Sequence, residues 1–241
     1  MNTTIEKYLN NHSTFTTSEF AEALRAETPT IGRSTIYDIL NKLCQDGKLS
    51  RRSRGVYTSN VKKEYSYELS ETARRVSATI SKEYPLVDFQ VWELYQMNEF
   101  VNHLISRNTV FVDAENILDE TVFELLFSKY SHVLHRPYEG EYYKYAGEET
   151  IVVQQLISEA PACYDDLHQA PLEKILVDLF SHGVVGKIIN HSEYRTIYED
   201  AFGKYRINQP KLFRYARRRG VEQTIKEFIL KETDITLEVS K

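Results

Sequence analysis

The feature that most constrains the fold is an apolar helical stripe that ends at a glycine and is followed directly by the pattern of a basic hairpin. Four residues share one face when successive positions are placed about 100° apart: Ile36, Ile39, Leu40 and Leu43. Asp46-Gly47 stops this helix, because glycine readily adopts the left-handed backbone at which helices end. Two short strands are predicted around Leu49–Arg51 and Gly55–Thr58, joined by the turn Arg52-Ser53-Arg54.

Two further helices are predicted ahead of this pattern. Apolar residues recur at helical spacing over residues 5–9, and a second helix begins at a capping box, in which Thr16 and Glu19 each bind the other residue's backbone amide. Pro and Gly within residues 29–32 break the chain before a third helix starts near Arg33. This order is the plan of a winged helix-turn-helix, and the run LNKLCQDGKLSRRSRGVYTS matches that family's usual passage from recognition helix to wing.

Positive charge is concentrated in the N-terminal part of an acidic chain. The 241 residues carry a net charge of −5, yet residues 1–63 hold ten Lys and Arg against six Asp and Glu. Within residues 31–63, eight cations are opposed only by Asp38 and Asp46. An acidic protein with one compact basic region is a common arrangement for a regulator that binds nucleic acid, and a solvated charged surface is the simpler interpretation.

The polar face of the third helix carries side chains that can read bases, since Asn and Gln bind adenine bidentately. The residues predicted to contact double-stranded DNA are Arg33, Ser34, Tyr37, Asn41 and Lys42 on the helix and Arg51, Arg52 and Arg54 on the wing. A module that contacts only proteins and a module that binds RNA are the competing interpretations. Asp38 would repel any phosphate that it faced.

Residues 64–241 are predicted to form a mixed α/β domain with a helical C-terminal half. Strands are expected near residues 86–93, 109–114, 133–135 and 150–153, and helices over 70–83, over 97–105 and from an N-cap at Asp119, with a tyrosine-rich loop over 138–145. Beyond Pro171 the apolar spacing is helical. The predicted fold is therefore α+β, with a winged helix-turn-helix at 1–63 followed by the mixed α/β domain at 64–241.

Three runs of the second domain carry a resemblance to a known family: YPLVDFQVWELYQMNEFVNHLISRNTVFVDAE, APLEKILVDLF and KYRINQPKLFRYARRRG. Together with the N-terminal module they resemble the AbiEi family of antitoxins from type IV abortive-infection toxin–antitoxin systems. The resemblance covers nearly the whole chain and implies a cytoplasmic phage-defence protein that represses its own operon at repeated half-sites in its promoter. It also implies that a nucleotidyltransferase-like toxin is neutralised without a stable complex, and it carries over no catalytic residues.

A second basic run lies near the C-terminus. Residues 204–219 hold seven cations and no acid. On a helix that starts after Asn208, one face gives a possible second basic surface of Lys211, Arg214, Arg217 and Arg218. Two interpretations are open: contact with DNA, RNA or an acidic protein, or pairing within the domain with the nearby acids Glu199, Asp200 and Glu222.

No motif of an enzyme is found. Asp113 and Glu115 follow a predicted buried strand, where carboxylates hold metals in nucleases, but this strand lacks the lysine of a restriction-type nuclease. The favoured interpretation is that both residues cap or solvate the strand end. The seven histidines lack HExxH spacing, and the sequence contains no glycine-rich phosphate loop and no GxSxG elbow. No enzyme activity, catalytic residue, metal or cofactor is therefore expected.

Composition excludes other classes and leaves two further functions open. No segment approaches the ~18 apolar residues of a membrane helix, and the N-terminus lacks the apolar core of a secretory signal. Cys44 and Cys163 are too few for a disulfide framework, which is typical of a protein in a reducing cytoplasm. The alternatives are a winged-helix regulator whose C-terminal domain senses a ligand or partner without any toxin, and a metal-dependent nuclease on the strand of Asp113 and Glu115.

Overall fold

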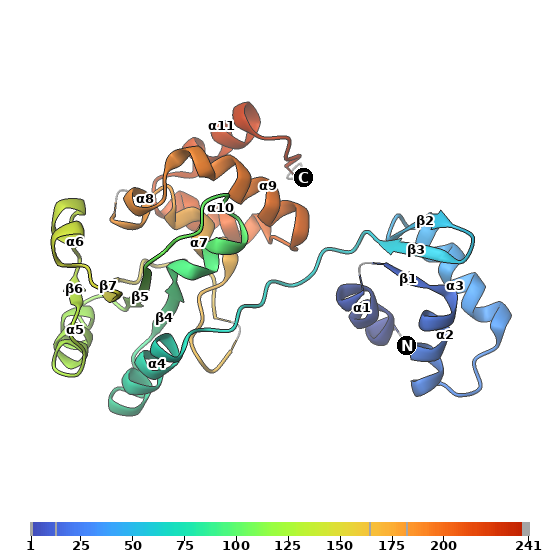
Figure 1. Ribbon diagram of the computed structural model, residues 1–241, viewed down its shortest axis with the longest axis horizontal. Helices are drawn as coiled ribbons and strands as arrows, with labels where there is room; N and C mark the ends of the chain where they lie inside the picture. The colour runs from blue at the N-terminus through green and yellow to red at the C-terminus, as the bar shows by residue number, and fades with distance from the viewer. Residues whose placement is uncertain (1, 13, 164, 182, 238–241) are drawn as a thin grey trace. The chain divides into compact units, whose positions relative to one another are not determined.

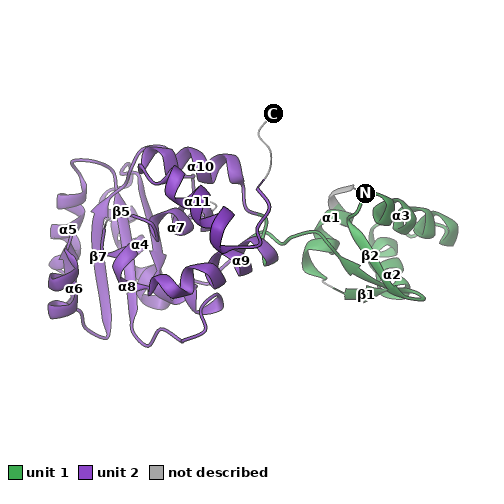
Figure 2. Ribbon diagram, turned by 90° about the horizontal axis from the view of Figure 1, so that it is seen from above, with its two compact units in different colours: residues 1–64, 204–206 green, residues 65–203, 207–241 purple. Residues whose placement is uncertain are grey.

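The structure of the chain is a computed structural model that describes residues 2–12, 14–163, 165–181 and 183–237. The chain divides into two units, shown in Figure 2: unit 1 contains residues 1–64 and 204–206, and unit 2 contains residues 65–203 and 207–241. The protein has the mixed α+β composition that was expected. Within the described ranges, no helix combines the length and the apolar character needed to cross a bilayer.

Unit 1 combines three helices with a three-stranded antiparallel sheet of order β1-β3-β2 (Figure 1). Its elements in chain order are α1 (Asn2–Asn11), β1 (Thr14–Thr16), α2 (Thr17–Glu27), α3 (Arg33–Gln45), β2 (Leu49–Ser53) and β3 (Val56–Ser59). The three helices and the hairpin confirm the predicted order of elements. Strand β1 was not predicted, and it pairs with β3 so that Phe15 lies opposite Tyr57.

The core of unit 1 draws apolar side chains from all of its helices and strands, among them Leu9, Phe15, Phe20, Leu24, Ile36, Leu40, Leu49 and Tyr57. The predicted capping box is also present at the start of α2. The Glu19 amide donates to Thr16 Oγ1 (3.3 Å), and the Thr16 amide donates to Glu19 Oε2 (2.6 Å). Because a hydrogen bond to a carboxylate favours its charged form, the Thr16 amide lowers the pKa of Glu19.

The hairpin differs from the prediction at its turn. Strand β2 continues through Arg52 to Ser53, so the predicted turn Arg52-Ser53-Arg54 is wrong and the turn lies at Arg54-Gly55. Gly55 has a φ of 78°, a conformation that favours glycine because it has no Cβ. The register also shifts between Arg51 and Ser53, which places a β-bulge in the basic strand.

Unit 2 is built on a four-stranded mixed sheet of order β4-β5-β7-β6. Its strands are β4 (Phe89–Glu93), β5 (Asn108–Ala114), β6 (Val133–His135) and β7 (Glu149–Gln155). β4 runs antiparallel to β5, whereas β5, β7 and β6 run parallel to one another. The carboxyl ends of these three parallel strands therefore share one edge of the sheet.

Helices cover both faces of this sheet (Figure 2). α4 (Glu71–Glu83) and α5 (Asp119–Phe127) pack their apolar side chains on one face. The opposite face carries Trp92 stacked on Phe111, and α7 (Leu172–Asp178) contacts it through Lys174. The other helices of unit 2 are η1 (Leu94–Glu99), α6 (Glu139–Tyr145), α8 (Val185–Ile188), η2 (His191–Glu193), α9 (Tyr194–Lys204), α10 (Gln209–Arg218) and α11 (Glu222–Glu232).

Two predicted elements of unit 2 are wrong. The expected loop at residues 138–145 is largely helix α6, which the buried Tyr142 anchors to β5 through a 2.6 Å hydrogen bond with Thr109. The expected helix at residues 97–105 is instead the end of the 3-10 helix η1 followed by irregular chain. The side chain of Asn98 stabilises this irregular segment. Its Oδ1 accepts a 2.7 Å hydrogen bond from the Ile105 amide, which in a helix would donate to a backbone carbonyl.

Asp119 does not cap α5 as predicted. Leu118 holds the N-cap position, and Asp119 is the first residue of the helix, with its side chain buried. Its Oδ2 lies 2.7 Å from both His135 Nε2 and Arg136 Nε, at the end of β6. Arg136 has a φ of 45°, so the chain accepts an unfavourable backbone conformation where this ion pair forms.

Candidate nucleic-acid interface

The polar face of α3 is open to solvent. Its apolar residues are turned into the core of unit 1, which leaves Ser34, Tyr37 and Asn41 exposed along the other side of the helix. Arg33 and Lys42 are also exposed, and neither forms an ion pair within the described part of the chain. The guanidinium carbon of Arg33 lies 5.9 Å from the ring centroid of Tyr37, which is a cation–π distance.

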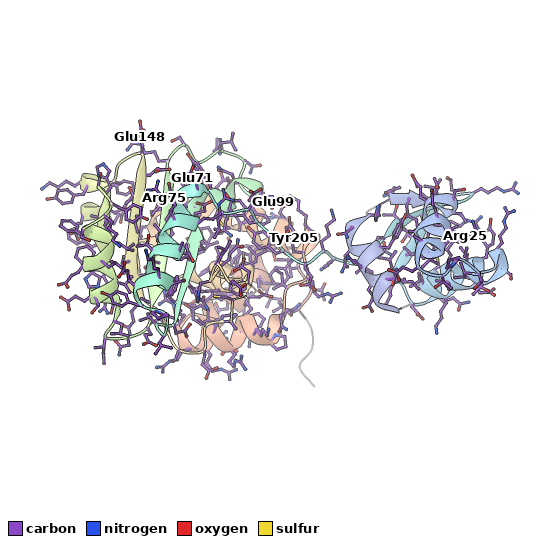
Figure 3. The ribbon with its side chains drawn as sticks, turned by 90° about the horizontal axis from the view of Figure 1, so that it is seen from below. Arg25, Glu71, Arg75, Glu99, Glu148 and Tyr205 are labelled. Atoms are coloured by element: carbon purple, nitrogen blue, oxygen red, sulfur yellow. The ribbon has the colours of Figure 1, made fainter. Side chains whose placement is uncertain are left out.

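A hollow of about 520 Å³ separates the start of α3 from α2, and it brings two of the predicted residues together. Arg33 and Tyr37 line it from α3, while Arg25, labelled in Figure 3, lines it from α2. Lys42 lies apart from them, because it lines a different hollow beside Glu6 of α1. The sequence did not indicate Arg25 as a site residue, because the position of one arginine on a helix does not show that its side chain lies beside the neighbouring helix.

The three arginines of the hairpin are all exposed, but their side chains differ in how they are held. Arg52 Nε donates to Thr58 Oγ1 (3.1 Å) across the hairpin, and Arg51 Nε lies 3.4 Å from the carbonyl oxygen of Ser53. Arg54, at the turn, has no hydrogen-bond or ion-pair partner among the described residues. The Thr17 amide donates to the Gly55 carbonyl (2.9 Å), which fixes the turn to the start of α2.

These groups have the chemistry of a surface that binds a polyanion. Guanidinium and ammonium groups can contact phosphates, while the short polar side chains of α3 can reach base edges. Asp38 is exposed on the same helix, and it opposes a phosphate that comes close to it.

Helix α10 carries the four predicted residues of the second basic surface, and two of them form ion pairs with acids of unit 2. Arg217 Nε lies 2.8 Å from Glu222 Oε2, and Arg214 Nε lies 3.1 Å from Glu159 Oε2. The guanidinium of Arg217 lowers the pKa of Glu222 to about 2, with a further contribution from Lys226. Of the four predicted surface residues, Arg218 donates to Ser158 Oγ (2.6 Å), and the Lys211 side chain has no partner in the described ranges.

Asp113 neither caps nor solvates the end of its strand, so that interpretation is wrong. Its carboxylate is buried, with Lys174 Nζ 2.5 Å from Oδ2 and Gln154 Nε2 donating to Oδ1 (2.7 Å). Strand β5 has no lysine of its own, and the lysine beside the Asp113 carboxylate is Lys174 of α7. Lys174 also lies 2.6 Å from Asp178, four residues later on the same helix.

The sequence contained one signal of this buried cluster. In the run LEKILVDLF, Lys174 and Asp178 are the only charges besides Glu173, and they stand four residues apart within an apolar stripe. Charged side chains are almost never fully buried unless they are paired. A lysine and an aspartate at this spacing on a buried helix therefore predict an ion pair, although their partner on β5 is not visible in the sequence.

Glu115 has a different environment from Asp113. It is half-buried and lines a cavity of about 640 Å³ together with residues that follow β7. This cavity lies at the edge of the sheet where β5 and β7 end, the usual position of ligand sites in open α/β sheets.

A family model with the description "Family of unknown function (DUF6577)" matches residues 35–235, from the first turn of α3 to a point beyond α11. No curated protein matches the chain.

Proposed function

The chain belongs to the DUF6577 family, whose function is unknown, and we propose that it is a transcriptional regulator that binds DNA through a winged helix-turn-helix in unit 1. The observation that carries the proposal is the polar face of α3, which is exposed and has no acidic partner for Arg33 or Lys42 in the described ranges. In this role Arg33, Ser34, Tyr37 and Asn41 enter the major groove.

The hairpin supports the same proposal. Its three exposed arginines are held on a strand whose turn is tied to the start of α2 through Thr17 and Gly55. A basic hairpin of this kind places positive charge beside a recognition helix, where it contacts phosphates without reading sequence. A module that contacts only proteins is the competing function, and the exposed carboxylate of Asp38 is the observation that favours it.

The wider role that we propose is that of an autorepressor and antitoxin. It rests on the resemblance of the sequence to the AbiEi family, which joins a winged helix to a C-terminal antitoxin domain. In this role the protein binds double-stranded DNA at its own promoter and neutralises a nucleotidyltransferase-like toxin without a stable complex, in the cytoplasm. Unit 2 carries the neutralisation, and no catalytic residue or cofactor is assigned to it.

Fluorescence anisotropy tests the DNA-binding proposal. The full chain is titrated into labelled DNA from immediately upstream of its own reading frame, and into scrambled DNA of the same length, over a series of salt concentrations. We expect binding to the upstream DNA that stays selective as salt rises, because base contacts depend less on released counterions than phosphate contacts do. Weak binding that is equal for the two DNAs and disappears with salt would overturn the proposal.

The antitoxin role has a separate test. The neighbouring reading frame is expressed under an inducible promoter with and without this chain. Growth arrest that this chain relieves is expected. If the neighbouring frame is harmless, or if the chain gives no relief, the antitoxin role is wrong while DNA binding is unaffected.

A second candidate function is a regulator whose unit 2 senses a ligand and that has no toxin. The observation that favours it is the cavity at the ends of β5 and β7. A regulator of this kind requires that a small molecule binds unit 2, whereas the antitoxin role does not.

A further inference from the structure

One cavity of unit 2 lies at the carboxyl edge of the parallel strands. About 640 Å³ of space is enclosed by the ends of β5 and β7, by the start of β4 and by the segment that precedes α7. Its polar lining includes Asp88, Gln90, Glu115, Cys163, Asp165 and Arg218. The volume is within the range of pockets that hold small organic molecules.

Two carboxylates stand opposite each other at this edge. The Glu115 amide donates to the Asp88 carbonyl (2.9 Å), which continues the antiparallel ladder one rung beyond the pair Phe89–Ala114. Side chains that are directly opposed on neighbouring strands lie close together, and like charges in that position repel. Neither Asp88 nor Glu115 has a cationic partner among the described residues, so the repulsion is not relieved within unit 2.

Other charges leave the pocket negative. Asp165 also lines it without a cationic partner in the described ranges, and Glu159 is paired with Arg214. One guanidinium is present, that of Arg218, which donates to Ser158 Oγ (2.6 Å). Among the described residues the lining therefore holds three carboxylates without a cationic partner, those of Glu115 and of the exposed Asp88 and Asp165, against one guanidinium. This excess of negative charge favours a ligand with more than one positive charge.

A buried hydrogen-bond acceptor in the pocket has no partner. Gln90 is 4% exposed, and its Nε2 donates to the Pro161 carbonyl (2.8 Å). Its Oε1 is buried and accepts no hydrogen bond from any described residue. Since leaving a buried acceptor unsatisfied costs free energy, the position suits a ligand that donates an N–H group.

The Cys163 thiol also lines the cavity. Burial raises its pKa to about 12, and the charges of Asp88 and Asp165 add to the effect. The thiol is therefore protonated at neutral pH and is not a nucleophile.

The described acids of the pocket do not form a metal-binding group. Within the described ranges, no three His, Cys, Asp or Glu side chains come close enough together to hold a metal. The lining also includes apolar groups, supplied by Leu156, Ile157, Ala160 and Ala162. Such walls match the methylene segments that separate the amino groups of a polyamine.

We propose that this cavity binds an aliphatic polyamine, with protonated amino groups on Asp88, Glu115 and Asp165 and with one N–H group donated to Gln90 Oε1. The binding gives unit 2 a small-molecule ligand, and it does not depend on whether unit 1 binds DNA.

Isothermal titration calorimetry of the full chain with spermidine, in 0.15 M salt and without DNA, tests the proposal. The double variant Asp88→Asn/Glu115→Gln keeps the shape of the pocket and removes the opposed charges. Asp166→Asn is the matched control, because Asp166 is exposed, next to Asp165 in sequence and outside the cavity lining. Circular dichroism melting confirms that each variant is folded.

We expect one equivalent of spermidine to bind the wild-type chain, with the double variant binding at least about tenfold more weakly, as the loss of charge-assisted hydrogen bonds requires. Asp166→Asn is expected to bind within about twofold of wild type, because an exposed charge outside the site contributes little. Non-saturating binding, or equal weakening by Asp166→Asn, would show attraction to a general acidic surface and overturn the proposal. Mg²⁺ that binds the same pocket and displaces spermidine at equal ionic strength would overturn it in favour of a metal.

Discussion

Lys174 Nζ lies 2.5 Å from Asp113 Oδ2, although the two residues are 61 positions apart in sequence and their side chains are only 1% and 3% exposed. The same ammonium lies 2.6 Å from Asp178 Oδ2, and Tyr215 Oη donates to the other oxygen of Asp178 (2.9 Å). With two carboxylates beside it, Lys174 has a raised pKa even though burial opposes its charge. A second cation lies at the end of α10, where Arg219 Nε is 3.3 Å from Asp178 Oδ1. The cluster therefore connects β5, α7 and α10 in the interior of unit 2.

Replacement of Lys174 by Met is expected to destabilise unit 2 by about 3–5 kcal/mol, because it leaves the buried Asp113 without a cation and leaves Asp178 with Arg219 alone. Urea unfolding at pH 7 measures the change. Lys82→Met, at an exposed position of α4, is the control and should change the stability by less than about 0.5 kcal/mol. A loss from Lys174→Met no larger than that of the control would contradict the role of the cluster.

The stabilities of wild type and Lys174→Met can also be compared at alkaline pH. Since the pKa of Lys174 is raised in the folded state, its stabilising contribution is complete below the unfolded-state pKa of about 10.4 and declines above it. The stability difference between wild type and Lys174→Met should therefore be constant from pH 7 to about pH 10 and narrow beyond. If the stability difference already narrows at pH 8, a group other than Lys174 is responsible for its pH dependence.

Asp119→Asn is expected to cost about 2–3 kcal/mol at pH 7, since the buried carboxylate accepts hydrogen bonds from the Arg136 guanidinium and from the His135 ring. Burial opposes the charge of Asp119, but the hydrogen bonds and charges of Arg136 and His135 together lower its pKa. Its contribution is therefore present above the unfolded-state pKa of about 3.9 and is lost as the pH falls through the lower, folded-state pKa.

Urea unfolding of Asp119→Asn and wild type at pH 7, 5 and 3 measures this dependence. The difference should persist at pH 5 and shrink at pH 3. Glu120→Gln, exposed at the next position of α5, should show little difference at any of the three pH values. Equal effects of the two substitutions would contradict the assignment of the ion pair.

Removal of the hairpin charges tests the wing. Replacing Arg51, Arg52 and Arg54 together by Ala should flatten the slope of log K against log salt for DNA binding by roughly 2.7, if each arginine neutralises one phosphate. Anisotropy over a salt series measures the slope. The control removes three exposed cations of unit 2, Arg75, Lys82 and Lys187, and should leave the slope unchanged. A slope that the wing substitutions do not alter would exclude phosphate contacts there.

Asn41→Ala tests base reading by α3. Loss of a bidentate contact should lower the preference for the upstream DNA over scrambled DNA by about 1–3 kcal/mol. Lys42→Ala, at the next position, should weaken binding to the two DNAs by similar factors, because a phosphate contact carries no sequence information. If Asn41→Ala weakens binding to both DNAs equally, α3 is not the element that reads sequence.

Much of unit 1 can be predicted from its sequence because its signals are local. The capping box at Thr16 and Glu19, the apolar stripe of α3 and the stop at Gly47 each lie within a few residues. Strand β1 escapes such reasoning, since its three residues are defined by pairing with β3, about forty positions away.

Unit 2 is less predictable because contacts distant in sequence decide its local structure. The tyrosine-rich segment becomes α6 when Tyr142 reaches Thr109 on β5, and periodicity gives no sign of that contact. The buried state of Asp113 depends likewise on Lys174, and the pocket at Glu115 depends on the chain that follows β7.

The residues of the buried cluster are far apart in the sequence, so they leave the ribosome at different times. The helices and hairpin of unit 1 are complete by residue 59, whereas β5 gains its parallel neighbour only with residues 149–155 and Asp113 gains its cation only with Lys174. Tyr215, whose hydroxyl donates a hydrogen bond to Asp178 Oδ1, is synthesised later still. Because domains fold as units as they leave the ribosome, the helices and hairpin of unit 1 are expected to be folded while Asp113 is still an unpaired, solvated carboxylate on a nascent chain.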